Sequence, residues 1–184
     1  MTPRHPRLSA LLCLLGANVC GVADAVVAVE VRGASTRAAP GTQAELGQRG
    51  KRFTPSVLAV QTGTEVNLPN FDTVRHHVYS FSPIKPFELK LYAGTPASPV
   101  RFDKPGVAVL GCNIHDKMTA YVRVVDTPYF ARTDAAGRAL LDVPPGDHRL
   151  TIWHAGLGVD TPPPSRPLKL GAAPTSLSVT LDAP

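Results

Sequence analysis

Short runs rich in Val, Leu and Thr, separated by Pro, Gly and polar residues, recur along this chain after residue 25, as is typical of β-strands. After residue 25 the pattern predicts strands at residues 26–32, 57–61, 65–68, 76–82, 87–92, 107–112 and 119–125. The turn Thr62-Gly63-Thr64 predicts a hairpin between two of these strands, and the polar segment 33–52 is expected to be a loop. Short strands at this spacing are typical of an antiparallel sandwich with Greek-key connections.

Short predicted strands separated by turns also follow residue 126, in a shorter segment of the chain. Residues 133–154 predict a strand, a turn at Pro144-Pro145-Gly146 and a second strand. The chain has 184 residues, and its 19 Pro and 15 Gly leave little room for long helices. We therefore expect an all-β protein with one sandwich over residues 26–126 and a small second β-sandwich module over residues 127–184.

The first 25 residues have the pattern of a secretory signal peptide. Arg4, His5 and Arg7 precede an apolar run over residues 8–17, and Ala23-Asp24-Ala25 is an A-x-A cleavage pattern. Lipoprotein processing at Cys20 is a less favoured alternative, since Asn18 and Val19 precede it instead of small residues. No stretch reaches the roughly 18 apolar residues of a membrane-spanning helix. The sequence predicts an exported, periplasmic protein without membrane insertion.

The net charge of the chain is a modest +5, from 19 Lys and Arg against 14 Asp and Glu. The basic residues are spread along the chain and form no run of like charges, which argues against dedicated nucleic-acid binding. Distributed positive charge is compatible with an acidic protein partner, because it steers encounters without specifying a site.

Removal of residues 1–25 would take Cys13 and Cys20 away and leave Cys112 as a lone cysteine. An exported free thiol needs burial, a metal or a catalytic role to survive oxidation. Cys112 is followed at steps of three by His115 and Met118. Thiolate, imidazole and thioether are the ligand types that suit copper in both oxidation states.

A blue-copper site needs a second imidazole from elsewhere in the chain. The adjacent residues His76 and His77 open a predicted strand 36 and 35 residues before Cys112. Neighbouring residues of a strand point to opposite faces, so at most one of the two can face the metal. Spacing alone leaves the choice between them open.

Several spaced motifs surround these residues. The pattern F-x-P-x-x-L-x-V-x-x-G-x-x-V starts at Phe53, Asn70 precedes His76 by six residues, and Pro105-Gly106 leads into the strand that ends at Cys112. With these motifs, residues 53–126 resemble a cupredoxin of the plastocyanin and amicyanin branch. The Cys-x-x-His-x-x-Met spacing is that of the compact amicyanin ligand loop. The surrounding sequence is similar to the exported plastocyanin-like proteins often labelled methylamine utilization proteins.

The resemblance implies one type 1 copper ion with His76, Cys112 and His115 as equatorial ligands and Met118 as the axial ligand. It implies single-electron transfer between redox proteins, such as a cytochrome c or a periplasmic dehydrogenase, and no enzymatic bond chemistry. At His77 the plastocyanin-like proteins have an asparagine that ties the two ligand loops together. This departure keeps His77 open as an alternative ligand.

The second β unit resembles the transthyretin-like or carboxypeptidase-regulatory type of small sandwich, through T-D-x-x-G-x-x-x-L-x-V-P-P-G from Thr133 to Gly146. We expect a structural or partner-docking module, with Trp153 in its core and His148 and His154 in structural roles. Two rival functions stay open: copper delivery without electron transfer, and a β-sandwich scaffold with a vestigial site. An oxidase is the weakest alternative, because the remaining histidines form no further clusters.

Overall fold

The computed structural model describes residues 9–15 and 21–181, and in this part of the chain it is all-β, as predicted, with one short 3-10 helix. The described residues contain no helix that is both long and apolar enough to cross a bilayer. The chain forms two compact units. One contains residues Ser35–Pro128, and the other combines the described residues up to Ala34 with those from Tyr129 onward.

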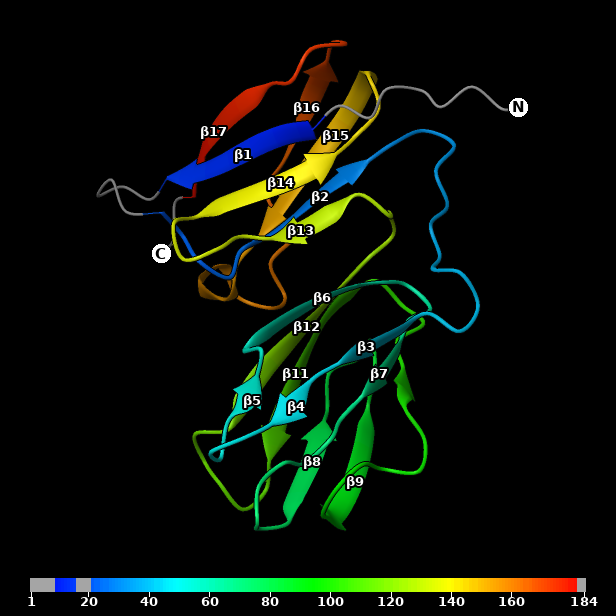
Figure 1. Ribbon diagram of the computed structural model, residues 1–184, viewed down its shortest axis with the longest axis vertical. Coiled ribbons are helices and arrows are strands. Elements are labelled where there is room, and N and C mark those ends of the chain that lie inside the picture. The colour runs from blue at the N-terminus through cyan, green and yellow to red at the C-terminus, as the bar shows by residue number, and fades with distance from the viewer. Residues whose placement is uncertain (1–8, 16–20, 182–184) are drawn as a thin grey trace. The chain divides into compact units, whose positions relative to one another are not determined.

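The unit Ser35–Pro128 is built on a five-stranded sheet (Figure 1). Its strand order is β6 (Val57–Gln61), β12 (Thr119–Val125), β11 (Gly106–Cys112), β8 (His76–Ser80) and β9 (Phe87–Tyr92). A three-stranded sheet holds β10 (Val100–Arg101), β7 (Glu65–Asn67) and β3 (Gln43–Glu45) in that order. Two short strands, β4 (Gly47–Gln48) and β5 (Phe53–Thr54), pair with each other.

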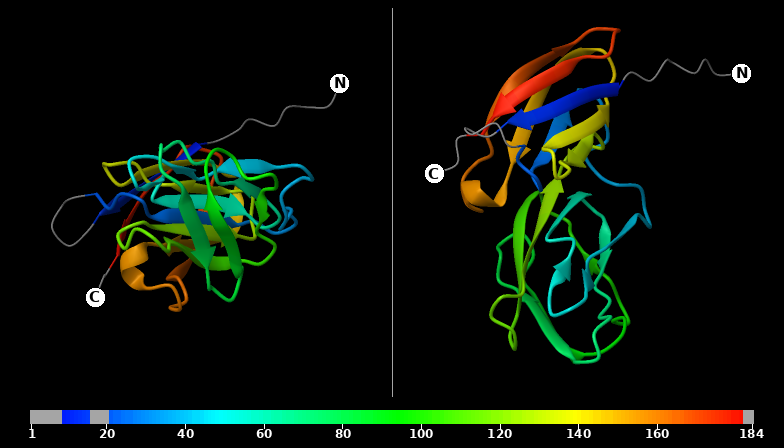
Figure 2. Two further views of the ribbon diagram at one scale, coloured as in Figure 1. Left: turned by 90° about the horizontal axis from the view of Figure 1, so that it is seen from below. Right: turned by 60° about the vertical axis from the view of Figure 1, so that its left-hand side comes forward.

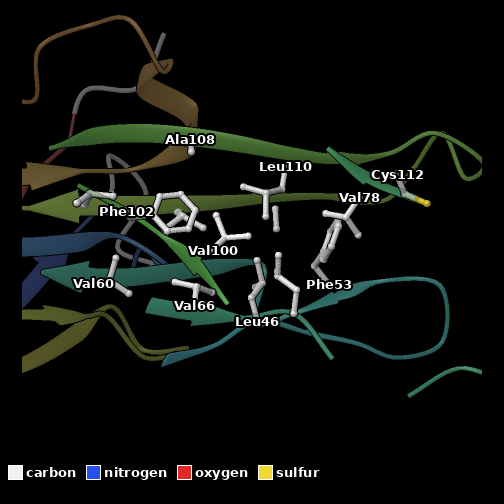
Figure 3. Close-up of a cluster of buried hydrophobic side chains, with 14 of the residues drawn as sticks. Leu46, Phe53, Val60, Val66, Val78, Val100, Phe102, Ala108, Leu110 and Cys112 are labelled. Atoms are coloured by element: carbon white, nitrogen blue, oxygen red, sulfur yellow. The ribbon is translucent and has the colours of Figure 1, made fainter. Parts of the chain in front are cut away.

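The core of this unit is one cluster of buried apolar side chains contributed by both sheets. Alternate residues of β8 and β12 point into it, since the burial of both strands follows the period of two. Figure 3 shows Phe102 toward one end of the cluster and Cys112 at the other, with the Cys112 sulfur directed away from the remaining side chains. Cys112, the last residue of β11, therefore lies at one end of the core.

The predicted hairpin of residues 57–61 and 65–68 is wrong, although both strands exist. β6 pairs in parallel with β12, whereas β7 pairs with β10 and β3. The connecting residues bond to other segments, since Thr62 N–H donates to Val125 O and Gly63 N–H donates to Phe102 O. The predicted loop 33–52 contains β3 and β4, whose two or three residues are too few for the alternation to be visible.

The second unit is itself a two-layer sandwich (Figure 2). One sheet has the order β13 (Phe130–Arg132), β2 (Val26–Glu30), β15 (Gly146–Trp153) and β16 (Ser165–Leu170). The other has the order β14 (Arg138–Asp142), β1 (Ser9–Leu15) and β17 (Ser176–Thr180). Apolar side chains of both sheets share one cluster, and Trp153 is buried as predicted.

The predicted boundary at residue 26 differs from the structure. β2 forms where expected, but it pairs with β13 and β15, so residues 26–34 belong to the second unit. Strand pairing is a long-range contact that the local pattern of β2 does not encode. β1 falls in the predicted signal peptide and pairs with β14 and β17 in the intact chain. Residues 1–8 and 16–20 lie outside the described residues, and cleavage after Ala25 stays a prediction.

Candidate metal centre

Strand pairing brings His76 close to Cys112. β8 and β11 run antiparallel, with Val78 opposite Cys112 in the register. His76 lies two residues before Val78 and therefore on the same face of the sheet, which is the buried face of β8. The side chains of His76 and Cys112 thus lie on the same side of neighbouring strands.

The loop that follows β11 returns His115 to the cysteine. His115 N–H donates to Cys112 O at 3.5 Å, and Met118 N–H donates to His115 O at 3.0 Å. Asn113 N–H donates to His77 O at 3.0 Å, which ties the start of the loop to β8. Successive short turns of this kind fold the Cys-x-x-His-x-x-Met segment back over the end of the sheet.

Three donor atoms converge at this end of the core. Cys112 Sγ is 3.7 Å from His76 Nδ1 and 3.7 Å from His115 Nδ1, and the ligand atoms of the three residues all lie within 4.8 Å of one another. The imidazole rings are tilted by 58° with centroids 5.0 Å apart. His76 and Cys112 are buried, whereas His115 is half-buried and reaches the surface.

The two sulfur–nitrogen distances fit a metal ion bound by the thiol and by each imidazole. With a metal–sulfur bond of about 2.3 Å and a metal–nitrogen bond of about 2.0 Å, a trigonal angle of roughly 120° separates sulfur from nitrogen by about 3.7 Å. A ligand plane of two imidazoles and one thiolate is the donor set of blue-copper sites. The chain thus presents this donor set, with both sulfur–nitrogen distances at the value expected for a shared metal ion.

Met118 is buried in the same apolar cluster as Cys112, at 2% exposure. A buried thioether can serve as a weak metal ligand or as core filler. The structure therefore places the fourth predicted ligand in the same cluster as the thiol and leaves its axial role a proposal.

His77 does not take part in this group. Its side chain lies on the opposite face of β8, and its Nε2 is 2.7 Å from Glu88 Oε1 on β9. Among the described residues, the side chains suited to hold a metal gather only at His76, Cys112 and His115. The described histidines of the second unit have backbone partners. His148 Nε2 lies 2.8 Å from Pro144 O, and His154 Nδ1 accepts a hydrogen bond from Gly156 N–H.

Sequence reasoning missed Asp72, whose carboxylate lies on the side of the His76 ring that faces away from Cys112. Asp72 Oδ2 is 2.8 Å from His76 Nε2, the ring nitrogen that faces away from the sulfur. Burial raises the pKa of the Asp72 carboxyl, but hydrogen bonds from the Lys51 backbone and the His76 ring outweigh burial and hold the pKa below its ordinary value. The only signal in the sequence is an aspartate four residues before His76.

Asn70, the residue six positions before His76 in the motif above, is buried and organises the loop that carries Asp72. Its Nδ2 donates to Val74 O at 2.8 Å and to Tyr92 O at 3.0 Å, and its Oδ1 accepts from Asp72 N–H at 2.9 Å. One amide thus connects the ends of the loop before His76 to the neighbouring strand β9.

Tyr92 lies opposite His76 in the register between β8 and β9. Its hydroxyl donates to Leu68 O at 2.7 Å and also contacts Gln48 Nε2. Burial raises the pKa of Tyr92 to about 12, so the phenol is neutral at physiological pH.

No protein-family model and no curated protein matches the chain. Similar solved structures include a purple cupredoxin from Nitrosopumilus maritimus, with 22% identity, 45% of this chain and 98% of that chain covered, and a TM-score of 0.38. Amicyanin from Paracoccus versutus has 15% identity, 52% and 96% covered, and a TM-score of 0.38. The copper-containing nitrite reductase of Thermus scotoductus has 23% identity, 60% and 28% covered, and a TM-score of 0.43.

Proposed function

We propose that the unit Ser35–Pro128 holds one type 1 copper ion and transfers single electrons between redox proteins. In this proposal His76 Nδ1, Cys112 Sγ and His115 Nδ1 are the equatorial ligands and Met118 is the axial ligand. The observation that carries the proposal is the convergence of the three donor atoms, with both sulfur–nitrogen distances at 3.7 Å.

Copper is favoured over zinc by the donor set. Zinc sites in proteins are almost always four-coordinate and tetrahedral, whereas a trigonal plane of one thiolate and two imidazoles with a weak thioether suits copper in both oxidation states. Binding requires the Cys112 thiolate, and coordination would protect this buried thiol from oxidation in an exported protein.

The bound ion would supply the chemistry by cycling between its two oxidation states. The protein's contribution is to hold the ligands in one arrangement: His76 and Cys112 are fixed by strand pairing, and His115 by the short turns after β11. A site that is already shaped reorganises little when the charge changes. His115 is the one equatorial ligand that reaches the surface, so electrons would enter and leave at its edge.

An export signal over residues 1–25 would place the protein in the periplasm, where its partner would be a redox protein such as a cytochrome c or a dehydrogenase. The proposal describes an electron carrier and no enzyme. The similarity to exported plastocyanin-like proteins that are often labelled methylamine utilization proteins is compatible with this role, and the second unit would serve as a structural or docking module.

Copper reconstitution of the protein tests the proposal. We expect one ion per chain, an intense blue absorption band with the spin-resonance spectrum of a type 1 site, and reversible reduction. Cys112→Ser and His76→Ala should abolish the blue band, and His77→Ala should keep it. Tight binding of colourless Cu(I) without reversible oxidation would favour copper delivery, and the absence of stoichiometric copper would favour a scaffold.

A further inference from the structure

The two nitrogens of the His76 ring are both engaged, on opposite sides. Nδ1 faces the Cys112 sulfur at 3.7 Å, and Nε2 faces Asp72 Oδ2 at 2.8 Å. The His76 side chain is fully buried and that of Asp72 is 12% exposed, so solvent competes little for this contact. An ionised carboxylate can only accept hydrogen bonds, and Nε2 must therefore carry the proton. The Nδ1 lone pair is then directed into the group of donor atoms.

The carboxylate that holds His76 is itself held by the turn between β4 and β5. Asp72 Oδ1 accepts from Gly50 N–H at 2.6 Å and Oδ2 accepts from Lys51 N–H at 2.9 Å. Gly50 and Lys51 have φ values of 61° and 57°, and the residues on either side, Arg49 and Arg52, bond to each other's backbone in both directions. This is a two-residue turn with both central residues in the left-handed region.

The two central residues of this turn thus direct their backbone N–H groups at the same carboxylate. A lysine at positive φ is uncommon, and here its conformation directs the backbone N–H at the carboxylate. Asp72 N–H in turn donates to Asn70 Oδ1, which fixes the backbone of the residue that presents the carboxylate. Three segments of the chain thus determine where one carboxylate oxygen lies relative to the His76 ring.

We propose that Asp72 is a positioning residue of the metal centre, which orients the His76 imidazole, fixes its tautomer and lowers the reduction potential of the bound ion. The inference rests on the proposed copper function. A carboxylate bonded to the far nitrogen makes the imidazole a stronger donor. The stronger donor favours the more highly charged Cu(II) over Cu(I), and a preference for the oxidised form is a lower potential.

Glu88 provides a matched control within the same strand pair. Its Oε1 is 2.7 Å from His77 Nε2, so it makes the same type of contact with the next residue of β8. That contact lies on the opposite face of the sheet and does not involve the donor atoms of the site. Asp72→Asn and Glu88→Gln therefore remove one carboxylate charge each from imidazole–carboxylate pairs of similar length, the second pair being more exposed, and only the first pair includes a proposed ligand.

The experiment measures Cu(II) and Cu(I) affinities and the reduction potential for the full-length protein and both variants. We expect Asp72→Asn to weaken Cu(II) binding by roughly 10–100-fold and Cu(I) binding by less. Each tenfold excess loss for Cu(II) raises the potential by about 59 mV. Glu88→Gln should leave all three quantities unchanged. Equal potentials in the two variants would overturn the proposal.

A second measurement needs neither copper nor a variant. Nitrogen-15 NMR of the metal-free protein at about pH 9, well above the ordinary imidazole pKa, reports which ring nitrogen carries the proton. We expect His76 as the Nε2–H tautomer, and an Nδ1–H tautomer would overturn the proposal even if Asp72→Asn fails to fold. A protein that shows the Nε2–H tautomer but binds no copper would refute the proposed function and leave the carboxylate contact intact.

Discussion

Truncation of Phe102 to alanine should destabilise the unit Ser35–Pro128 strongly and leave the metal centre unchanged. Phe102 is completely buried, and its ring lies edge-on to Phe87 with centroids 6.5 Å apart and an angle of 87°. Loss of a buried phenylalanine side chain costs about 3–5 kcal/mol in total, of which the aromatic pair contributes roughly 0.5–1.5 kcal/mol. A reduction of about 4 kcal/mol is a large part of the stability of a domain of this size.

The buried thiol of Cys112 provides the assay. Cys112 is 5% exposed and belongs to the same cluster as Phe102, so in an assay without metal a thiol reagent should reach it when the cluster opens. A loss of about 4 kcal/mol corresponds to a roughly thousandfold larger open fraction, and labelling of the Cys112 peptide should accelerate by that factor. Phe102→Leu keeps most of the buried volume and should accelerate labelling far less.

Because Phe102 lies far from the metal centre within the cluster, its truncation should lower the stability without changing the geometry of the centre. Figure 3 shows it well away from Cys112 within the cluster, so the folded fraction of Phe102→Ala should keep the absorption spectrum of the copper-loaded protein. Acceleration of less than about tenfold would refute the estimate, because it corresponds to less than about 1.4 kcal/mol. A changed spectrum in folded protein would refute the view that strand pairing and the ligand loop determine the site locally.

Three further outcomes are expected. Folding raises the pKa of Tyr92 from 10 to about 12, so the folded state favours the neutral phenol. Titration of Tyr92 should therefore leave the free energy of unfolding unchanged below pH 10, and should lower it as the pH rises from 10 to 12. Unfolding measured over that range should show this loss in the wild type and not in Tyr92→Phe. Gly106→Ala should cost roughly 1–3 kcal/mol, because Gly106 has φ 134° and an added Cβ would lie 2.8 Å from Ile84 Cγ2; Gly171→Ala, with no atom near the added Cβ, is the control in urea unfolding. Copper at a hundredfold excess over its dissociation constant should raise the unfolding free energy by about 2.7 kcal/mol, a gain that a chelator reverses and that Cys112→Ser lacks.

The part of this protein that the sequence determines by itself is local. Short runs rich in apolar and β-branched residues predict β6, β9 and β12 with the bounds that the structure has. In β12 the burial follows the period of two that one buried face of a strand imposes. The spacing from Cys112 to His115 needs only one short turn to bring the two side chains together, so this half of the donor group could be predicted without a fold.

Tertiary structure decided everything that depends on which strands pair. The register between β8 and β11 selects His76 over its neighbour, and a shift of one residue would have reversed the choice. Pairing also separates β6 from β7 and moves β2 into the second unit. Asp72 is held by the backbone of a turn some twenty residues earlier in the chain. No local sequence pattern predicts this contact, because its partners are distant in sequence and meet only when the sheets form.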